Sequence, residues 1–258
     1  MKKELKSEGK CLFCGETLTQ KEINRHLAKH LKEKVKTGKP GTSFLVKVEI
    51  GKRRDTSPYF LSLWIDGEAK LEKLDDFLRD IWLECCGHLS AFNIPKKKRS
   101  QDLNVIAIYN AIRNNEEAEY PNEVPMERKT KVVFCKGMIL EYEYDFGHTT
   151  DLDITVVNEY PIKADKKIVL LSRNEPLERI CPVCKKYPAT QIYIDYENNG
   201  NDIFCDKCLE KHTKDDEDFY EDMCLPVVNS PRMGVCSYTG GIIDIERDGV
   251  SGVSNPSK

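Results

Sequence analysis

Residues 44–50 of this chain read Phe44-Leu45-Val46-Lys47-Val48-Glu49-Ile50. Apolar residues fill every second position here, and that period predicts a half-buried β-strand. Residues 59–65, which are rich in apolar and aromatic side chains, predict a second strand. From residue 71 to residue 85, apolar side chains instead recur every three or four positions, which predicts an amphipathic helix. The first part of the main body therefore combines strands with a helix.

The rest of the body continues this mixture. A further helix is predicted at 104–113, strands at 138–146, 152–157 and 167–171, and exposed loops at 95–99 and 114–125. Helices and strands do not alternate regularly, which favours an α+β fold over a doubly wound parallel sheet. We expect a body at 42–175, separated by the breaker-rich segment 37–41 from a small module at 8–36, and followed by a second small module at 177–258.

The strongest motif lies in the C-terminal module. Two Cys-x-x-Cys pairs, Cys181 with Cys184 and Cys205 with Cys208, are separated by twenty residues. The intervening sequence predicts a hairpin with a Gly/Asn turn at 197–201, which is the layout of a zinc ribbon. Four thiolates leave no open coordination position, so a structural zinc ion is predicted, with a single iron ion as the alternative for the same ligands.

A second quartet lies near the N-terminus. Cys11, Cys14, His26 and His30 have the spacing C-x2-C-x11-H-x3-H. Two thiolates on a tight turn and two imidazoles one helical turn apart can surround one zinc ion. The sequence resembles a C2H2 zinc finger with one residue fewer than usual between the second Cys and the first His. Thr19-x-x-Glu22 predicts a capping box at the start of the helix.

The remaining cysteines have no partner at ligand spacing in the sequence. We therefore expect Cys224, Cys236, Cys135 and the adjacent Cys85-Cys86 to be small buried apolar residues. His88 precedes an apolar run and is expected to be a core histidine. The sequence thus predicts two zinc ions per chain. His212 follows the second Cys pair closely but is not needed as a ligand.

Charge and composition indicate the environment and the partners. The N-terminal segment Met1–Lys10 is polar, no run of about 18 apolar residues occurs, and the 11 cysteines are odd in number. We therefore expect a cytoplasmic protein with reduced thiols and no membrane segment. Residues 1–40 hold 11 Lys and Arg against 5 Asp and Glu, whereas residues 181–258 hold 8 against 14. Only the N-terminal module suits a polyanion such as DNA or RNA.

Three stretches carry a family resemblance, and they occur in the order 86–92, 142–147 and 225–240. They read Cys86-Gly87-His88-Leu89-Ser90-Ala91-Phe92, then Tyr142-Glu143-Tyr144-Asp145-Phe146-Gly147, then a tail containing Asn229-Ser230-Pro231-Arg232. Together they are similar to the plasmid ORF-three-like family, whose members are described as transposon passenger or TnpR-type proteins. The resemblance implies a compact α+β domain and a link to mobile elements, but no defined activity. The run after Gly147 departs from the family pattern.

Three functions remain open at this level. The leading hypothesis is a non-enzymatic zinc protein that binds nucleic acid or a partner, with Lys21, Arg25, Lys29 and Lys32 contacting phosphates. The first alternative is a protein-interaction adaptor whose zinc sites are purely structural. The second is a metal-dependent hydrolase or nuclease in which His88 and the acidic strand ending at Asp145 converge. Alternation of Glu with Tyr in that strand is more typical of one solvated strand face.

Overall fold

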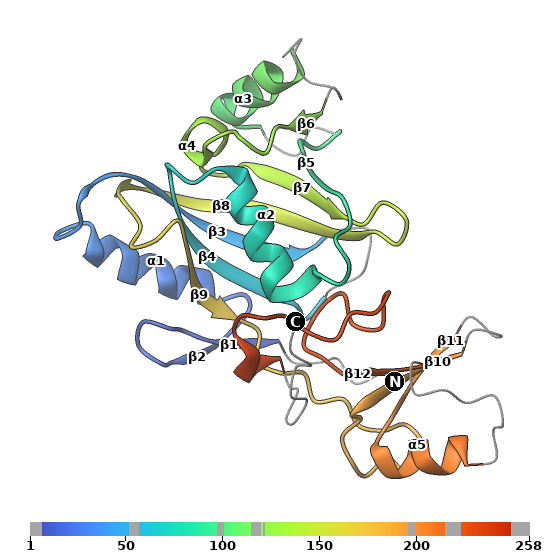
Figure 1. The fold of residues 1–258 in the computed structure, drawn as a ribbon. Helices are drawn as coiled ribbons and strands as arrows, with labels where there is room; N and C mark the ends of the chain where they lie inside the picture. Colours follow the sequence, from blue (N-terminus) through green and yellow to red (C-terminus); the bar gives the residue numbers. More distant parts are fainter. Residues whose placement is uncertain are drawn as a thin grey trace. The chain divides into compact units, whose positions relative to one another are not determined.

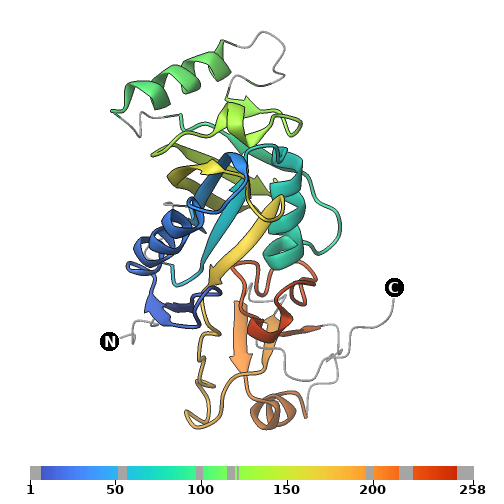
Figure 2. The ribbon, with the colours of Figure 1, turned by 90° about the vertical axis from the view of Figure 1, so that its left-hand side faces the viewer.

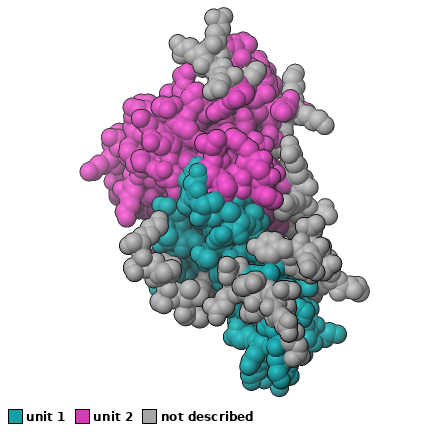
Figure 3. Space-filling model, turned by 45° about the vertical axis from the view of Figure 1, so that its right-hand side comes forward, with its two compact units in different colours: residues 1–5, 79–87, 176–258 teal, residues 6–78, 88–175 magenta. Residues whose placement is uncertain are grey.

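The computed structural model of this chain describes seven stretches. They are residues 7–51, 57–96, 101–114, 120, 122–195, 200–214 and 223–248. The chain divides into two compact units (Figure 3). Unit 1 comprises residues 1–5, 79–87 and 176–258, and unit 2 comprises residues 6–78 and 88–175. Each unit is described separately below.

Unit 2 is built on a seven-stranded antiparallel sheet in the order β6-β5-β7-β8-β3-β4-β9 (Figure 1). Its strands are β3 (Pro40–Ile50), β4 (Phe60–Asp66), β5 (Ser90–Asn93), β6 (Glu123–Val124), β7 (Ile139–Tyr144), β8 (Thr150–Ile162) and β9 (Ile168–Arg173). A separate two-stranded hairpin is formed by β1 (Glu8–Lys10) and β2 (Thr17–Thr19). The helices of unit 2 are α1 (Ile23–Lys34), α2 (Leu71–Leu78), α3 (Leu103–Arg113) and α4 (Thr130–Val133).

The sheet carries a helix on each face. Helix α1 covers one face and α2 the other, as the edge-on view shows (Figure 2). Every residue of β4 is buried because the strand is covered on both faces. Five of its seven residues are apolar, and the buried Ser62 hydroxyl donates to the Asn24 side-chain oxygen at 2.9 Å. The indole of Trp64 in this strand donates to the Ser43 hydroxyl at 2.8 Å, which satisfies its buried N–H.

Helix α1 shares a hydrophobic core with the sheet. Ile23, Leu27 and Leu31 pack in one cluster with Phe60 and Trp64 of β4. The other buried members are Cys11, Ala28, Leu45, Tyr160, Ile162 and Leu171. The apolar side of the small N-terminal module is therefore buried against the body. Strand β3 begins at Pro40, so the segment 37–41 leads straight into the sheet instead of forming a free linker.

Unit 1 contains the ribbon and a short helical segment from earlier in the chain. Its three-stranded antiparallel sheet has the order β11-β10-β12, with β10 (Gln191–Asp195), β11 (Gly200–Phe204) and β12 (Cys224–Pro226). Helix α5 (Asp206–Thr213) follows β11, and a 3₁₀ turn, η3 (Ile245–Arg247), lies near the end. The earlier segment is η1 (Arg79–Leu83), a turn of π-helix.

The α+β class predicted from the sequence is confirmed, with an antiparallel sheet and mixed helices. The two units do not follow the three expected ranges 8–36, 42–175 and 177–258, because the N-terminal module belongs to unit 2 and residues 79–87 belong to unit 1. The helix expected over 71–85 ends as α-helix at Leu78 and continues as the π-turn. Residues 196–199, where most of the ribbon's turn was predicted, lie outside the described residues.

Candidate metal centres

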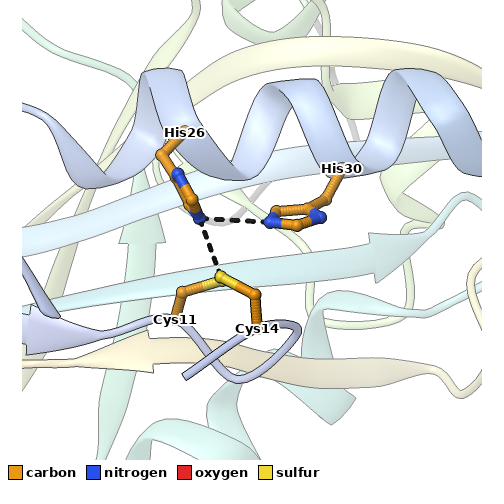
Figure 4. Close-up of side chains that lie close together, drawn as sticks. All are labelled: Cys11, Cys14, His26 and His30. Atoms are coloured by element: carbon orange, nitrogen blue, oxygen red, sulfur yellow. Dashed lines mark hydrogen bonds between the residues drawn. The ribbon is translucent and has the colours of Figure 1, made fainter. Parts of the chain in front are cut away.

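The first quartet is held by the β1–β2 hairpin and α1, which together form the ββα layout of a zinc finger. Cys11 and Cys14 lie on the loop between the two strands, and His26 and His30 project toward them from α1 (Figure 4). Gly15 has a φ of 82°, and its N–H donates to the Cys11 carbonyl at 2.8 Å. This left-handed turn suits glycine and brings the two sulfurs to the same side of the loop.

Distances between the donor atoms fit a tetrahedral zinc ion. Bonds of about 2.3 Å from zinc to sulfur and about 2.0–2.1 Å from zinc to nitrogen imply tetrahedron edges of about 3.5 Å for S···N and about 3.3 Å for N···N. The Cys14 sulfur lies 3.2 Å from His26 Nε2, which lies 3.1 Å from His30 Nε2. All four donor atoms lie within 4.8 Å of one another. The predicted set Cys11, Cys14, His26 and His30 is therefore brought together.

Groups around this quartet support metal binding. The Glu16 carboxylate lies 3.5 Å from His26 Nδ1, and a carboxylate on the second ring nitrogen is the usual way in which a ligand histidine is oriented. Burial raises the pKa of the Cys11 thiol, while backbone N–H groups of Cys14 and Phe13 act in the opposite direction. A buried thiol of this kind ionises when a cation takes the place of its proton.

The capping prediction at α1 is wrong. The helix begins at Ile23, and its N-cap residue, Glu22, makes no side-chain cap. Instead the Thr19 hydroxyl donates to the Glu22 carboxylate at 2.7 Å. Hydrogen bonds from Thr19, with a smaller contribution from Arg25, hold the pKa of Glu22 below its usual value. Thr19 ends strand β2, and its carbonyl accepts from the Glu22 N–H at 2.9 Å, so Thr19 closes the turn before the helix and does not cap it.

The four basic residues singled out from the sequence lie on one side of α1 and just before it. Lys21, Arg25, Lys29 and Lys32 are all exposed and recur at intervals of four, four and three residues, which places them along one helix face. Lys34 is engaged elsewhere: its ammonium lies 3.1 Å from the Asp165 carboxylate. The exposed row is therefore free to meet an external partner.

A shallow groove of about 850 Å³ begins beside the start of this row. Lys21 and Asn24 line one part of it, and Lys47 and Glu49 of β3 line another. The Lys47 ammonium lies 2.6 Å from the Glu49 carboxylate, so this pair adds no net charge. The groove extends the exposed surface beside α1, whereas the positive charge of this region comes from the row of basic residues.

The second quartet occupies the loops of the ribbon in unit 1. The sulfurs of Cys181, Cys184, Cys205 and Cys208 lie within 4.8 Å of one another. Cys184 and Cys205 are 3.8 Å apart, which equals the edge of about 3.8 Å expected for two thiolates on zinc and far exceeds a disulfide bond of about 2.05 Å. Strands β10 and β11 pair in register between the two Cys pairs, as the sequence predicted.

The pKa values of two thiols in this quartet are shifted in opposite directions. Burial raises the pKa of the Cys181 thiol, but N–H donors from Cys184, Cys205 and Val183 outweigh it and lower the pKa to about 6. Burial and the neighbouring thiols raise the pKa of Cys208 to about 12. The first thiolate thus forms readily, whereas all four can be thiolates together only around a cation.

His212 is not part of the ribbon quartet. Its ring stacks on Phe204 at 4.9 Å between centroids and meets Tyr193 edge-on at 5.4 Å. These contacts account for the histidine as a packing residue of the hairpin and α5.

Sequence reasoning missed a third group. Cys85, Cys86 and Cys236, all of unit 1, make a further set of side chains able to hold a metal ion. The expectation that these cysteines are buried is wrong, because Cys86 and Cys236 are exposed and Cys85 is half-buried. The adjacent Cys85-Cys86 pair was a visible signal, but Cys236 lies 150 residues after Cys86 and only the fold places it there.

His88 and Asp145 of unit 2 lie together, as the hydrolase alternative requires. His88 Nε2 is 3.5 Å from the Asp145 carboxylate, and its ring meets Tyr144 edge-on. The side chain of His88 is 30 % exposed, so it is not a core histidine. Strand β7 buries its tyrosines and leaves Glu141 and Glu143 half-exposed, as expected for one solvated face. Asp145 has a φ of 63° and accepts from the N–H groups of Gly147 and His148.

Comparison with known proteins adds little about function. Among the described residues, no helix combines the length and the apolar character needed to cross a membrane. No family model and no curated protein match the chain. Among solved structures, a Methanosarcina mazei Go1 protein of unknown function is similar over 54% of this chain and 70% of that one, with 14% identity and a TM-score of 0.36.

Proposed function

We propose that this chain is a non-enzymatic zinc protein that binds DNA or RNA through the exposed basic face of α1. The observation that carries the proposal is the row Lys21, Arg25, Lys29 and Lys32 on a helix whose opposite side is fixed by a metal quartet and by the core of unit 2. Binding of a polyanion to a row of cations releases the counterions of the polyanion, which favours binding. Because the row is already held in place, binding does not have to order the protein. Each of the two predicted quartets has four protein ligands and leaves no position for a substrate.

The expected contact is with phosphates and not with base edges. In the zinc-finger register, Thr19, Glu22 and Arg25 would face bases. The Thr19 hydroxyl is hydrogen-bonded to the Glu22 carboxylate, and a carboxylate at that position repels phosphate. We therefore infer binding that depends on backbone charge and salt more than on sequence.

We also propose that the chain belongs to the plasmid ORF-three-like family and acts in the context of mobile elements. Parts of two family-like stretches, residues 90–92 and 142–144, pair with each other in the sheet of unit 2. Strand β5 pairs with β7 so that Ser90 is opposite Tyr144 and Phe92 is opposite Tyr142. The Ser90 and Tyr142 hydroxyls both donate to Asp75 at 2.6 Å. A shared structural role explains why the two motifs occur together.

The test neutralises the basic row in the full-length zinc-loaded protein. Deleting residues 1–40 is unsuitable, because α1 supplies part of the core of unit 2. The test variant carries Lys→Gln or Arg→Gln at all four positions. The control removes the same charge from four exposed lysines elsewhere in unit 2, namely Lys70, Lys73, Lys136 and Lys166.

Binding to a duplex and to a single strand is titrated at two salt concentrations. The log–log salt slope on duplex DNA is expected to be about −0.9 for each phosphate neutralised, so losing four contacts reduces it by about 3.6. The control variant should retain most of the affinity. Equal loss in both variants, or no salt-sensitive binding by the unmodified protein, refutes the proposal and favours the protein-interaction adaptor.

A further inference from the structure

We propose that the chain holds a third metal ion, a zinc or similarly thiophilic divalent cation, bound within unit 1 by Cys85, Cys86 and Cys236. These are residues that the sequence spacing does not pair, and the proposal is independent of nucleic-acid binding. It raises the expected content from two to three zinc ions per chain.

The sulfur separations are those of metal ligands. Cys85 and Cys86 are 3.8 Å apart, and Cys86 and Cys236 are 3.5 Å apart. Two thiolates on one tetrahedral zinc ion are separated by about 3.8 Å, whereas a disulfide requires about 2.05 Å. The same separation of 3.8 Å occurs between Cys184 and Cys205 in the ribbon.

Specific hydrogen bonds within unit 1 bring the three cysteines together. The π-turn η1 ends two residues before Cys85, and the C-terminal tail docks onto its carbonyl groups. The Ser230 hydroxyl donates to the Trp82 carbonyl at 2.7 Å, and the Ile242 N–H donates to the Asp80 carbonyl at 2.7 Å. A Cβ on Gly241 would lie 2.4 Å from the Ile81 carbonyl oxygen, so this approach requires glycine. π-turns of this kind occur frequently at functional sites.

The backbone at two of the positions is also unusual. Cys236 adopts a left-handed conformation with a φ of 54°, which is unfavourable for a non-glycine residue and persists only where the surroundings enforce it. Gly87, directly after Cys86, has a φ of 78°, and its N–H donates to the Glu84 carboxylate. Gly15, directly after Cys14 in the first quartet, has a φ of 82°. In both clusters, a glycine with a left-handed backbone directly follows a cysteine of the cluster.

Charge at the cluster fits a bound cation with three thiolates. Arg232 is fully buried, and its Nη2 lies 3.7 Å from the Cys85 sulfur. Three thiolates and a divalent ion carry a net charge of −1. A buried guanidinium is stabilised by such a neighbour, since an isolated charge is costly inside a protein.

The experiment measures metal content and thiolate ligation in the full-length protein after dialysis against a weak chelator. Three zinc ions per chain are expected for the unmodified protein and two for Cys236→Ser. Cys135→Ser, which alters a cysteine outside all three groups, should keep three. In the cobalt-loaded form, thiolate-to-cobalt charge-transfer absorbance should fall from nine thiolates per chain to six in Cys236→Ser.

A further variant protects the result against simple misfolding. Cys236→His replaces one ligand type by another, and histidine tolerates a left-handed backbone better than most residues. It should keep three ions with eight thiolates. Two ions in the unmodified protein, three in Cys236→Ser, or a disulfide among these cysteines in place of metal would each overturn the proposal.

Discussion

Truncating Leu27 to alanine tests whether the zinc finger is part of the body of unit 2. Leu27 is fully buried on α1, one residue after the candidate ligand His26. Its side chain belongs to the cluster that also contains Phe60 and Trp64 of β4. If the finger were a separate module, its loss would leave the sheet intact. Because the core is shared, we expect the whole of unit 2 to be destabilised.

The size of the effect follows from the burial. Replacing a buried leucine by alanine removes its transfer free energy and leaves a cavity, which together cost about 2–5 kcal/mol. That is a large part of the stability of a typical domain, about 5–15 kcal/mol. The matched control is Leu103→Ala on α3, where the side chain is 81% exposed. This change should alter the free energy of unfolding by no more than about 0.5 kcal/mol.

Tryptophan fluorescence during urea unfolding provides the assay. The chain has two tryptophans, so a Trp82→Phe background leaves Trp64, beneath α1, as the reporter. The midpoint of the Trp64 transition should fall in Leu27→Ala and stay near the parent value in Leu103→Ala. If Leu27→Ala abolishes the finger's helix while the Trp64 transition is unchanged, the reasoning from a shared core is refuted.

Two further predictions concern metal and pH. Cys205→Ser should remove one zinc ion and unfold the ribbon, since metal binding of roughly 10–16 kcal/mol supports such small modules. Limited proteolysis of this variant should then cut unit 1 and leave unit 2 intact. Equal degradation of both units would contradict this prediction. Hydrogen bonds from Lys129 and Lys131 lower the pKa of Glu68 to about 2. Because this pKa lies below its unfolded value, the stabilising effect is present above about pH 4.5 and is lost as the pH falls toward 2. An NMR titration of the Glu68 carboxyl group with a midpoint near 4.5 would show that the ion pairs do not form in solution.

Much of this protein was predictable from local patterns. A tetrahedral site built from two Cys-x-x-Cys turns, or from a Cys pair and two histidines one helical turn apart, needs only short-range geometry. Both predicted quartets, Cys11 to His30 and Cys181 to Cys208, are accordingly brought together. Alternation along residues 44–50 likewise predicted a strand, since side-chain direction in a strand depends only on position.

The tertiary structure decided what depends on distant segments. Cys86 meets Cys236 across 150 residues, because the tail docks on the carbonyls of the π-turn, and no spacing rule encodes that docking. The sequence predicted a domain boundary after the finger, but Leu27 and its neighbours are buried against Trp64 of the sheet. The pattern of an amphipathic helix predicts that one face will be buried, but only the folded chain determines which surface covers that face.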